Sequence, residues 1–410
     1  MKTGEQINPS EQAVLRLLNA ALHKDIETSV PDNIDWREVG AIGRKHAILP
    51  LVLQGAVIVR DTCPIPDETL QEWKRFAVTV VMHNERSMQA QENIVSMLKT
   101  AGIPSVVLKG ASVAASYPNP ELRILGDIDL LVSEERSAEA LDLLVANGYN
   151  RHEFNHPFHI GLDKAGIYLE LHYAVTQFPD SAIGQEVKLL LNNAVDRATT
   201  ARIGRYSFPV LSEVDQALSL LLHMERHLVN IGIGLRQLCD WCVFIGSLRA
   251  DALKERVLPA IAECRLMQFA KTLTNVCVRY LGLDEMEQQW CLDIEEETAR
   301  DLMLDILASG NIVSGEVEHN TGSRIVSGEQ DGKKVALGIS VLRSLTVSAK
   351  QQFRICRAVP LVIPFFWLYL PVRYYVRMKK GIRPKQDVRK IAKHAMRRKN
   401  LYQKMRLFKV

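Results

Sequence analysis

The chain has 410 residues, of which 47% are hydrophobic and 24% are charged, and its formal net charge is +4. This composition excludes a disordered chain, a collagen-like fibre and a coiled-coil rod, and the length predicts more than one structural unit. Seven irregularly spaced cysteines exclude a small secreted scaffold held by disulfides, and they are typical of a reducing, cytoplasmic compartment.

Residues 1–95 predict an N-terminal helical region. Ser10 precedes an amphipathic run and is a candidate N-cap, and Asp35 opens a second helix that we expect to continue toward Pro50. A third, long helix is predicted over residues 65–101, because this segment is rich in Gln, Glu, Lys and Met and a glycine follows it.

Residues 96–180 predict a compact unit in which strands alternate with helices. The predicted strands are short and apolar, each has a glycine beside it, and the last one alternates between polar and apolar residues. We therefore expect an α+β protein with an α/β core, namely a small mixed sheet flanked by N- and C-terminal helical regions. Strands are predicted at residues 103–109, 128–132 and 167–173, and helices at residues 110–117 and 133–147.

The rest of the chain divides by composition into three segments. Residues 181–308 predict a helical domain, residues 309–350 a polar, glycine-rich insertion or linker, and residues 351–410 an apolar-aromatic and then polybasic tail. The tail holds 17 Lys/Arg and one acid, a formal charge of +16, whereas the preceding part of the chain carries −12. Such a basic segment predicts an anionic partner.

The tail supports two interpretations. The 15 uncharged residues between Arg357 and Arg373 would form a helix of about 22 Å, shorter than the ~30 Å hydrocarbon core of a bilayer. Residues 358–410 could anchor the protein at an anionic membrane surface, or they could pack on the body with a solvated basic end. Nucleic acid is a less favoured partner, because the aromatic residues precede the basic ones instead of interleaving with them.

Three acids are the candidates for the chemistry. Asp127 and Asp129 lie two residues apart at a predicted strand, so both carboxylates project from one face. Neighbouring buried carboxylates are costly unless cations neutralise them, and carboxylate oxygens suit Mg²⁺. Glu170 lies in the middle of the next predicted strand, and the three acids converge if the two strands are neighbours. The pattern predicts a site for two Mg²⁺ ions.

The residues just upstream predict a site for the phosphates of an NTP. Gly110 ends one predicted strand and begins a helix, where backbone N–H groups could meet phosphate oxygens. Lys109 could add a positive charge, Ser112 a hydroxyl group and Arg123 a bidentate guanidinium.

These motifs resemble the polymerase-β-type nucleotidyltransferase superfamily and, more narrowly, a bacterial family of uncharacterised nucleotidyltransferases. The resemblance covers most of residues 30–250. It implies that Asp127 and Asp129 bind metal, that Glu170 is the third acid and a candidate base, and that the protein could act in polysaccharide or peptide biosynthesis. It is carried by Leu108-Lys109-Gly110, Tyr117, Arg123, Asp127-Ile128-Asp129-Leu-Leu-Val, Glu170-Leu171-His172, Asp35-Trp36 and residues 234–240.

Further polar residues form a second tier. His172 shares the strand face of Glu170. His159 is expected to be a polar residue of the preceding loop, where it could approach the nucleotide. His223 is four residues before another histidine, a spacing that suits either zinc or two packed rings. Arg236 and Asp240 are also four apart and predict either an ion pair along a helix or side chains that face the site.

The sequence as a whole predicts a Mg²⁺-dependent nucleotidyltransferase that moves an NMP from an NTP to an acceptor hydroxyl or phosphate. Two alternatives are a toxin-like transferase that acts on tRNA or protein, and a non-catalytic scaffold at a membrane surface that keeps a degenerate fold. We expect the protein to be cytoplasmic, and the membrane-anchor interpretation of the tail would place it at the inner face of the membrane.

Overall fold

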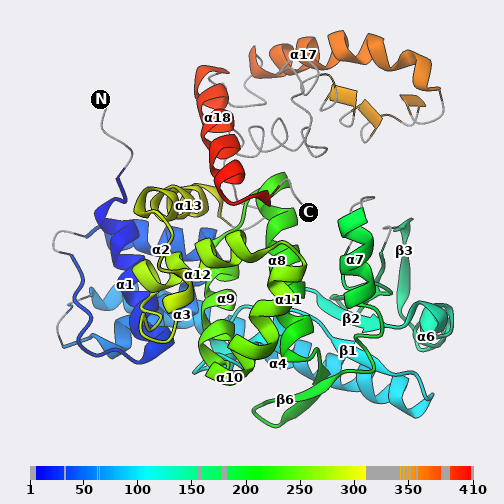
Figure 1. Ribbon diagram of the computed structural model, residues 1–410, viewed down its shortest axis with the longest axis horizontal. Helices are drawn as coiled ribbons and strands as arrows, with labels where there is room; N and C mark the ends of the chain where they lie inside the picture. The colour runs from blue at the N-terminus through cyan, green and yellow to red at the C-terminus, as the bar shows by residue number, and fades with distance from the viewer. Residues whose placement is uncertain are drawn as a thin grey trace.

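The computed structural model describes residues 6–31, 34–61, 63, 65–155, 158–176, 182–310, 342, 345–346, 349–350, 353, 355–356, 359–379 and 388–407. Helices surround a seven-stranded mixed sheet (Figure 1), so the predicted α+β class is confirmed. The predicted glycine-rich linker lies almost entirely outside the described residues.

Four helices precede the sheet, namely α1 (Pro9–His23), α2 (Trp36–Lys45), α3 (Leu49–Ile58) and α4 (Asp67–Thr100). The predicted start of the second helix at Asp35 is confirmed, and the Asp35 side chain caps α2 by accepting the N–H groups of Arg37 and Glu38. The predicted cap Ser10 is wrong. Asn8 caps α1 instead and forms a reciprocal pair with Glu11, which leaves Ser10 buried inside the first turn. The helix predicted to continue toward Pro50 ends at Lys45.

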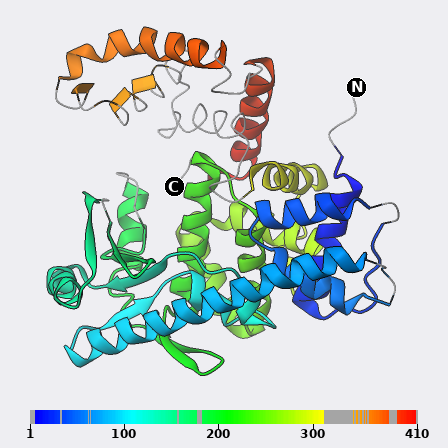
Figure 2. The ribbon, with the colours of Figure 1, turned by 180° about the vertical axis from the view of Figure 1, so that it is seen from behind.

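The long helix α4 connects the N-terminal helices to the sheet (Figure 2). Its N-terminal half contributes Trp73 and Ala77 to the core of the helical body, which is formed by α1, α3 and the helices that follow the sheet. Its C-terminal half packs under the sheet. At mid-length, buried Asn84 donates to the carbonyl oxygens of Glu121 and Arg123, at 2.8 and 2.9 Å, and accepts the N–H of Leu125 at 3.1 Å. One side chain of α4 therefore fixes the loop that leads into the second strand.

The sheet has the strand order β3-β4-β5-β2-β1-β7-β6. β2 runs parallel to β5 and antiparallel to β1, and β1 runs parallel to β7, while the outer pairs are antiparallel. The three predicted strands are confirmed in place, the second with its predicted bounds. The strands are β1 (Ser105–Val107), β2 (Ile128–Val132), β3 (Asn150–Asn155), β4 (His159–Lys164), β5 (Ile167–His172), β6 (Thr199–Ile203) and β7 (Tyr206–Val210).

Each face of the sheet covers a different core. Leu130 and Val132 of β2, with Leu169 and Leu171 of β5, join the cluster that contains the C-terminal half of α4. Leu131 lies on the opposite face and joins the core of the helical body. Because side chains alternate along a strand, Asp129, Glu170 and His172 share the face of Leu131. They therefore point toward the helical body.

The helical body contains α8 (Glu213–Asn230), α9 (Leu235–Ser247), α12 (Met267–Leu281) and α13 (Glu296–Ser309), and one continuous core joins it to α1 and α3. Shorter helices complete the body and cover the sheet. They are α5 (Gly110–Ala114), α6 (Ser137–Ala146), α7 (Ala182–Leu190), α10 (Ala250–Ala252) and α11 (Leu258–Glu263).

The described part of the basic tail contains two longer helices, α17 (Ile363–Lys379) and α18 (Val388–Lys404). α18 docks on α13: Arg398 binds Asp305 through two nitrogen atoms at 2.7 and 2.9 Å, and Arg397 donates to Asp301 at 2.8 Å. Part of the tail's charge is thus neutralised by the acidic body. α17 lies outside the main body in both views (Figures 1 and 2). Among the described residues, no helix has both the length and the apolar content needed to cross a membrane.

Candidate active site

The centre of the site is the pairing of β2 with β5. Asp129 lies in register with Glu170, and Leu131 lies in register with His172. The polar side chains of Asp129, Glu170 and His172 are therefore close neighbours on this face. Asp127 is the residue just before β2, and its side chain is exposed. The strands predicted to bring the acids together are therefore adjacent, as the convergence of the three acids requires.

Asp129 is held by two cationic or donor groups. The Lys109 amine is 3.1 Å from its Oδ1, and the Nε2 of His172 is 2.9 Å from the same oxygen. Burial would raise the pKa of the Asp129 carboxyl, but Lys109 and the hydrogen bond from His172 outweigh it and hold that pKa well below the usual value. Asp129 therefore carries a full negative charge near neutral pH.

Glu170 is bracketed by two histidines. The Nε2 of His172 is 3.2 Å from Oε2, and the Nε2 of His159 is 3.6 Å from Oε1. Against the opposing effect of burial, the hydrogen bond from His172 lowers the pKa of Glu170. The expectation that His159 belongs to a loop is wrong, because it is the first residue of β4 and pairs with His172 across the β4–β5 ladder.

Asp127 differs from the other two acids. Partial burial, followed by the negative charges of Glu170 and Asp129, raises the pKa of its carboxyl, and the positive charges of Arg236 and Lys109 only partly oppose this. Its carboxylate is therefore the one whose charge the surrounding protein compensates least. A cation at this position would favour the ionised form.

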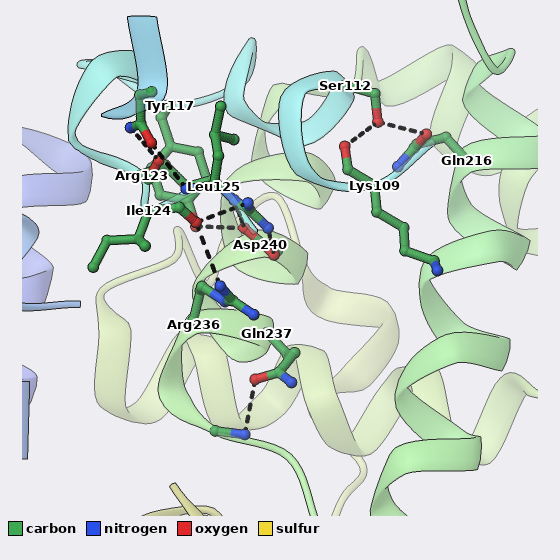
Figure 3. A network of polar contacts seen from close by, with 12 residues as sticks. Lys109, Ser112, Tyr117, Arg123, Ile124, Leu125, Gln216, Arg236, Gln237 and Asp240 are labelled. Atoms are coloured by element: carbon green, nitrogen blue, oxygen red, sulfur yellow. Dashed lines mark hydrogen bonds and ion pairs between the residues drawn. The ribbon is translucent and has the colours of Figure 1, made fainter. Parts of the chain in front are cut away.

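The turn at Lys109 and Gly110 is stabilised by hydrogen bonds of the Ser112 side chain. Lys109 adopts a left-handed backbone angle, φ +42°, which is a strained conformation for a residue with a side chain. The hydroxyl of buried Ser112 lies 2.7 Å from the carbonyl oxygen of Lys109 and 3.2 Å from Oε1 of Gln216 on α8 (Figure 3). Ser112 is thus engaged in fixing the turn.

Arg123 is engaged in a buried network with Asp240. Its Nε and Nη2 donate to the two carboxylate oxygens of Asp240 at 3.0 and 2.6 Å, and the Tyr117 hydroxyl donates to the same carboxylate at 2.7 Å (Figure 3). Both ionic partners are almost completely buried. The Arg123 guanidinium, predicted to bind phosphate in a bidentate manner, therefore binds the Asp240 carboxylate of α9 in this structure.

Arg236 does not form the predicted ion pair with Asp240, whose partner is Arg123. Instead its Nη1 lies 3.4 Å from the carbonyl oxygen of Ile124, and its buried Nε has no hydrogen-bond partner among the described residues. Burial, and then the charge of Arg123, lowers the pKa of Arg236. Of the two arginines, Arg236 is the one with unused donor capacity.

The two histidines of α8 lie against each other, with ring centroids 4.2 Å apart. Burial, together with the nearby charge of Lys109, places the pKa of His223 well below its usual value, and burial lowers that of His227 to about 4. Both rings are therefore neutral near neutral pH. Among the described residues, the one group that combines three metal-ligating side chains is His159, Glu170 and His172, whose ligand atoms lie within 4.8 Å of one another.

A cavity of about 460 Å³ opens near the carboxyl ends of β2 and β5. Its wall includes Leu131, Tyr173 and Phe158, together with residues of α7 and of the turn that follows it. Phe158 also packs against the rings of His159 and His172, with centroid distances of 4.9 and 5.7 Å. The cavity thus adjoins the histidine side of the site.

Comparison with known families identifies the family of the chain. A family described as "uncharacterised nucleotidyltransferase" matches residues 32–282. The chain belongs to this nucleotidyltransferase family. The match begins before α2, ends after α12 and includes every residue of the candidate site, whereas the basic tail lies beyond it. It confirms the predicted resemblance and supports a transferase with an unknown acceptor. No curated protein matches the chain.

Proposed function

We propose that this nucleotidyltransferase moves an NMP from a Mg²⁺-bound NTP to an acceptor hydroxyl or phosphate. The observation that carries the proposal is the register of β2 and β5, in which Asp129 and Glu170 are direct neighbours on the face that also receives Asp127. Three carboxylates in this arrangement are oxygen donors that suit Mg²⁺, and the bound ion would neutralise charge on a polyphosphate.

The donor set fits Mg²⁺. Asp127 would be the first ligand, because its carboxyl is exposed and the protein leaves its charge poorly compensated. Asp129 and Glu170 would complete the site, with further positions for two ions taken by water and phosphate oxygens. When bound, Mg²⁺ neutralises phosphate charge and orients the reacting oxygens.

Four groups of the chain would bind and orient the triphosphate. The Lys109 amine lies beside Asp129 and would add positive charge, while Gly110 allows the backbone to approach the phosphates closely. Arg236 has donor capacity left and would contact the phosphates directly. Arg123 would act as a positioning residue, because its guanidinium holds Asp240 and the carbonyl oxygen of Ile124.

In the proposed reaction an oxygen of the acceptor attacks the α-phosphorus, the bond to the bridging oxygen of the β-phosphate breaks, and pyrophosphate leaves. Glu170 would serve mainly as a ligand, because a carboxylate whose pKa is lowered is a weak base. The acceptor proton would pass to solvent, because the carboxylate of Asp127 would be occupied as a metal ligand.

Calorimetry with the four NTPs and Mg²⁺ tests the proposal. We expect Mg²⁺-dependent NTP binding by the full chain. In Asp127→Asn and in Asp129→Asn the binding free energy should weaken by ~3 kcal/mol, which is about 100-fold in affinity. Asp163→Asn is the matched control, because Asp163 lies on β4 and pairs with His152 at the other end of the ladder. Equal binding by all four proteins would overturn the proposed site.

The acceptor separates the remaining candidates. An NTP labelled at the α-phosphate should transfer label to a polysaccharide or peptide precursor under the first interpretation, and to tRNA or protein under the toxin-like one. Label in tRNA that falls steeply with added salt would favour nucleic acid as the partner of the basic tail.

We also propose that α17 attaches the enzyme to an anionic membrane surface. Phe365 and Leu368 of α17 are 66% and 75% exposed, and exposed Val372 and Val376 continue the same helical stripe. Leu361, in the 3-10 turn just before α17, is 89% exposed. Apolar side chains beside a basic tail suit the boundary between acyl chains and anionic headgroups. This interpretation needs neither a membrane-spanning helix nor nucleic acid.

Vesicle sedimentation tests the attachment. The full chain should co-sediment with phosphatidylserine-containing vesicles and remain in solution with phosphatidylcholine alone, and Phe365→Ser/Leu368→Ser should weaken this binding. The control is Val78→Ser/Met82→Ser, which removes two equally exposed apolar side chains from α4. Equal losses in both double variants would contradict a specific role of α17.

A further inference from the structure

The β4–β5 ladder brings two imidazoles and a carboxylate to one point. His159 is paired with His172, and the Nε2 atoms of both rings face Glu170, at 3.6 Å from Oε1 and 3.2 Å from Oε2. All three ligand atoms lie within 4.8 Å of one another. Because the three residues belong to paired strands, their positions are set by the ladder.

The rings are oriented by packing. Phe158 meets the ring of His159 edge-on and lies tilted against that of His172, and the two histidine rings are 5.0 Å apart. The side chain of His172 is completely buried, and that of Glu170 keeps about a third of its surface. The cluster is therefore built into the protein and open on the carboxylate side.

His172 faces more acceptors than one hydrogen can serve. Its Nε2 is 2.9 Å from Asp129 and 3.2 Å from Glu170, so a single N–H would have to be shared by two carboxylates. A metal ion bound to the nitrogen lone pair would instead serve the imidazole and the carboxylates together. Two imidazoles with one carboxylate suit first-row transition ions, whereas Mg²⁺ prefers oxygen ligands.

We propose that His159, Glu170 and His172 bind a first-row divalent transition-metal ion, for which Zn²⁺ and Mn²⁺ are the probes. Three protein ligands leave coordination positions for water or a phosphate oxygen. The inference builds on the proposed function, because Glu170 belongs to both ligand sets. It assigns a different ion to the histidine side of the site and adds His159, which the transfer reaction had not used.

Lys109 limits how Asp129 can contribute. Its amine already lies 3.1 Å from the Oδ1 that His172 approaches. Asp129 would therefore support the ion mainly through charge, and Glu170 would be the carboxylate ligand. His223 and His227 are not members of this ligand set, and their rings on α8 pack against each other at an angle of 53°.

Metal binding without nucleotide tests the proposal. The full chain, stripped with chelator and reloaded, should retain one equivalent of Zn²⁺ through gel filtration in millimolar Mg²⁺, and should give a bound Mn²⁺ signal in electron paramagnetic resonance. His159→Ala and, separately, His172→Gln should each weaken Zn²⁺ binding at least about tenfold. His152→Ala is the matched control, because His152 pairs with Asp163 on the outer part of the sheet.

Circular dichroism would identify a variant that fails to fold, and His159→Ala, at an incompletely buried position, is the more tolerant of the two. Displacement of Zn²⁺ by an equal concentration of Mg²⁺, or unchanged affinity in His159→Ala, would overturn the inference. If Mg²⁺-dependent NTP binding persists while Zn²⁺ does not bind, this inference alone fails. If Zn²⁺ binds and no NTP does, the proposed function fails instead.

Discussion

Two charged clusters flank the loop before β2. The charges of one are compensated by neighbouring side chains, whereas those of the other are compensated only in part. In the first, Arg123 and Tyr117 satisfy the buried carboxylate of Asp240. In the second, Asp127 keeps a carboxyl whose pKa is raised by its acidic neighbours, and Arg236 keeps a buried nitrogen without a hydrogen-bond partner among the described residues. A complete network of this kind supports the fold, whereas an incomplete one leaves capacity for a ligand.

The largest effect on stability should come from breaking the complete network. Asp240→Asn leaves the Arg123 guanidinium buried without its counter-charge, and we expect a loss of ~3–5 kcal/mol in the free energy of unfolding. Asp127→Asn should leave stability equal or slightly higher, because it removes repulsion. Urea unfolding of both variants measures the contrast.

A double variant sharpens the same contrast. Arg123→Gln/Asp240→Asn removes both buried charges and should recover part of the stability that Asp240→Asn loses. If instead Asp127→Asn destabilises the protein as much as Asp240→Asn, then the carboxylate cluster supports the fold. This result would contradict the contrast between the two clusters.

The second prediction concerns buried groups that carry no charge. Buried His46 accepts the N–H of Leu235 at Nδ1, so its Nε2 donates to the carbonyl oxygen of Leu307, and burial lowers the pKa of His46 to about 3. His227 behaves alike, with a pKa lowered to about 4. Each ring binds a proton more readily in the unfolded chain, with its usual pKa near 6.5.

Stability should therefore be complete above pH ~6.5 and fall as the pH drops toward 4, by about 1.4 kcal/mol per pH unit for each histidine. Urea midpoints between pH 7.5 and 4.5 measure this slope, and in His46→Gln the slope should be shallower. A slope that is unchanged in His46→Gln would show that the ring is not a source of the acid sensitivity.

The smallest effect on the fold should come from Gly110→Ala. An added Cβ would lie 3.8 Å from Nη1 of Arg123 and 3.9 Å from Leu125, which are ordinary contacts, so stability should change by less than about 1 kcal/mol. If phosphates approach the Gly110 backbone, the methyl group should still weaken NTP binding about tenfold, or ~1.4 kcal/mol. Unchanged NTP affinity in calorimetry would move the phosphates away from this turn.

The sequence predicted the site where its signal is local. The bounds of β2, the start of a helix at Asp35 and the shared face of Glu170 and His172 follow from periodicity and from side-chain chemistry within a few residues. The resemblance to the family rests on the same short motifs, and the family match confirms it.

What the sequence did not predict depends on contacts between distant segments. The partner of Arg123 is 117 residues away, so the spacing of Arg236 and Asp240 on one helix suggested the wrong ion pair. His159 follows no clear apolar alternation, and only its pairing with β5 makes it part of the site. The short strands β3, β4, β6 and β7 were missed for the same reason, because pairing partners rather than local patterns stabilise them.

The reach of α4 has a practical consequence for dividing this protein. At about 1.5 Å per residue its 34 residues extend roughly 51 Å, from the N-terminal core to the underside of the sheet. A fragment limited to residues 96–180 would keep only the last five residues of α4. It would lack Asn84 and three of the apolar α4 side chains that pack on one face of the sheet, Met88, Ile94 and Val95. The smallest excisable unit that keeps the loop before β2 in place therefore begins upstream of α4. It also has to keep α18, because Leu401 and Tyr402 belong to the core of the helical body.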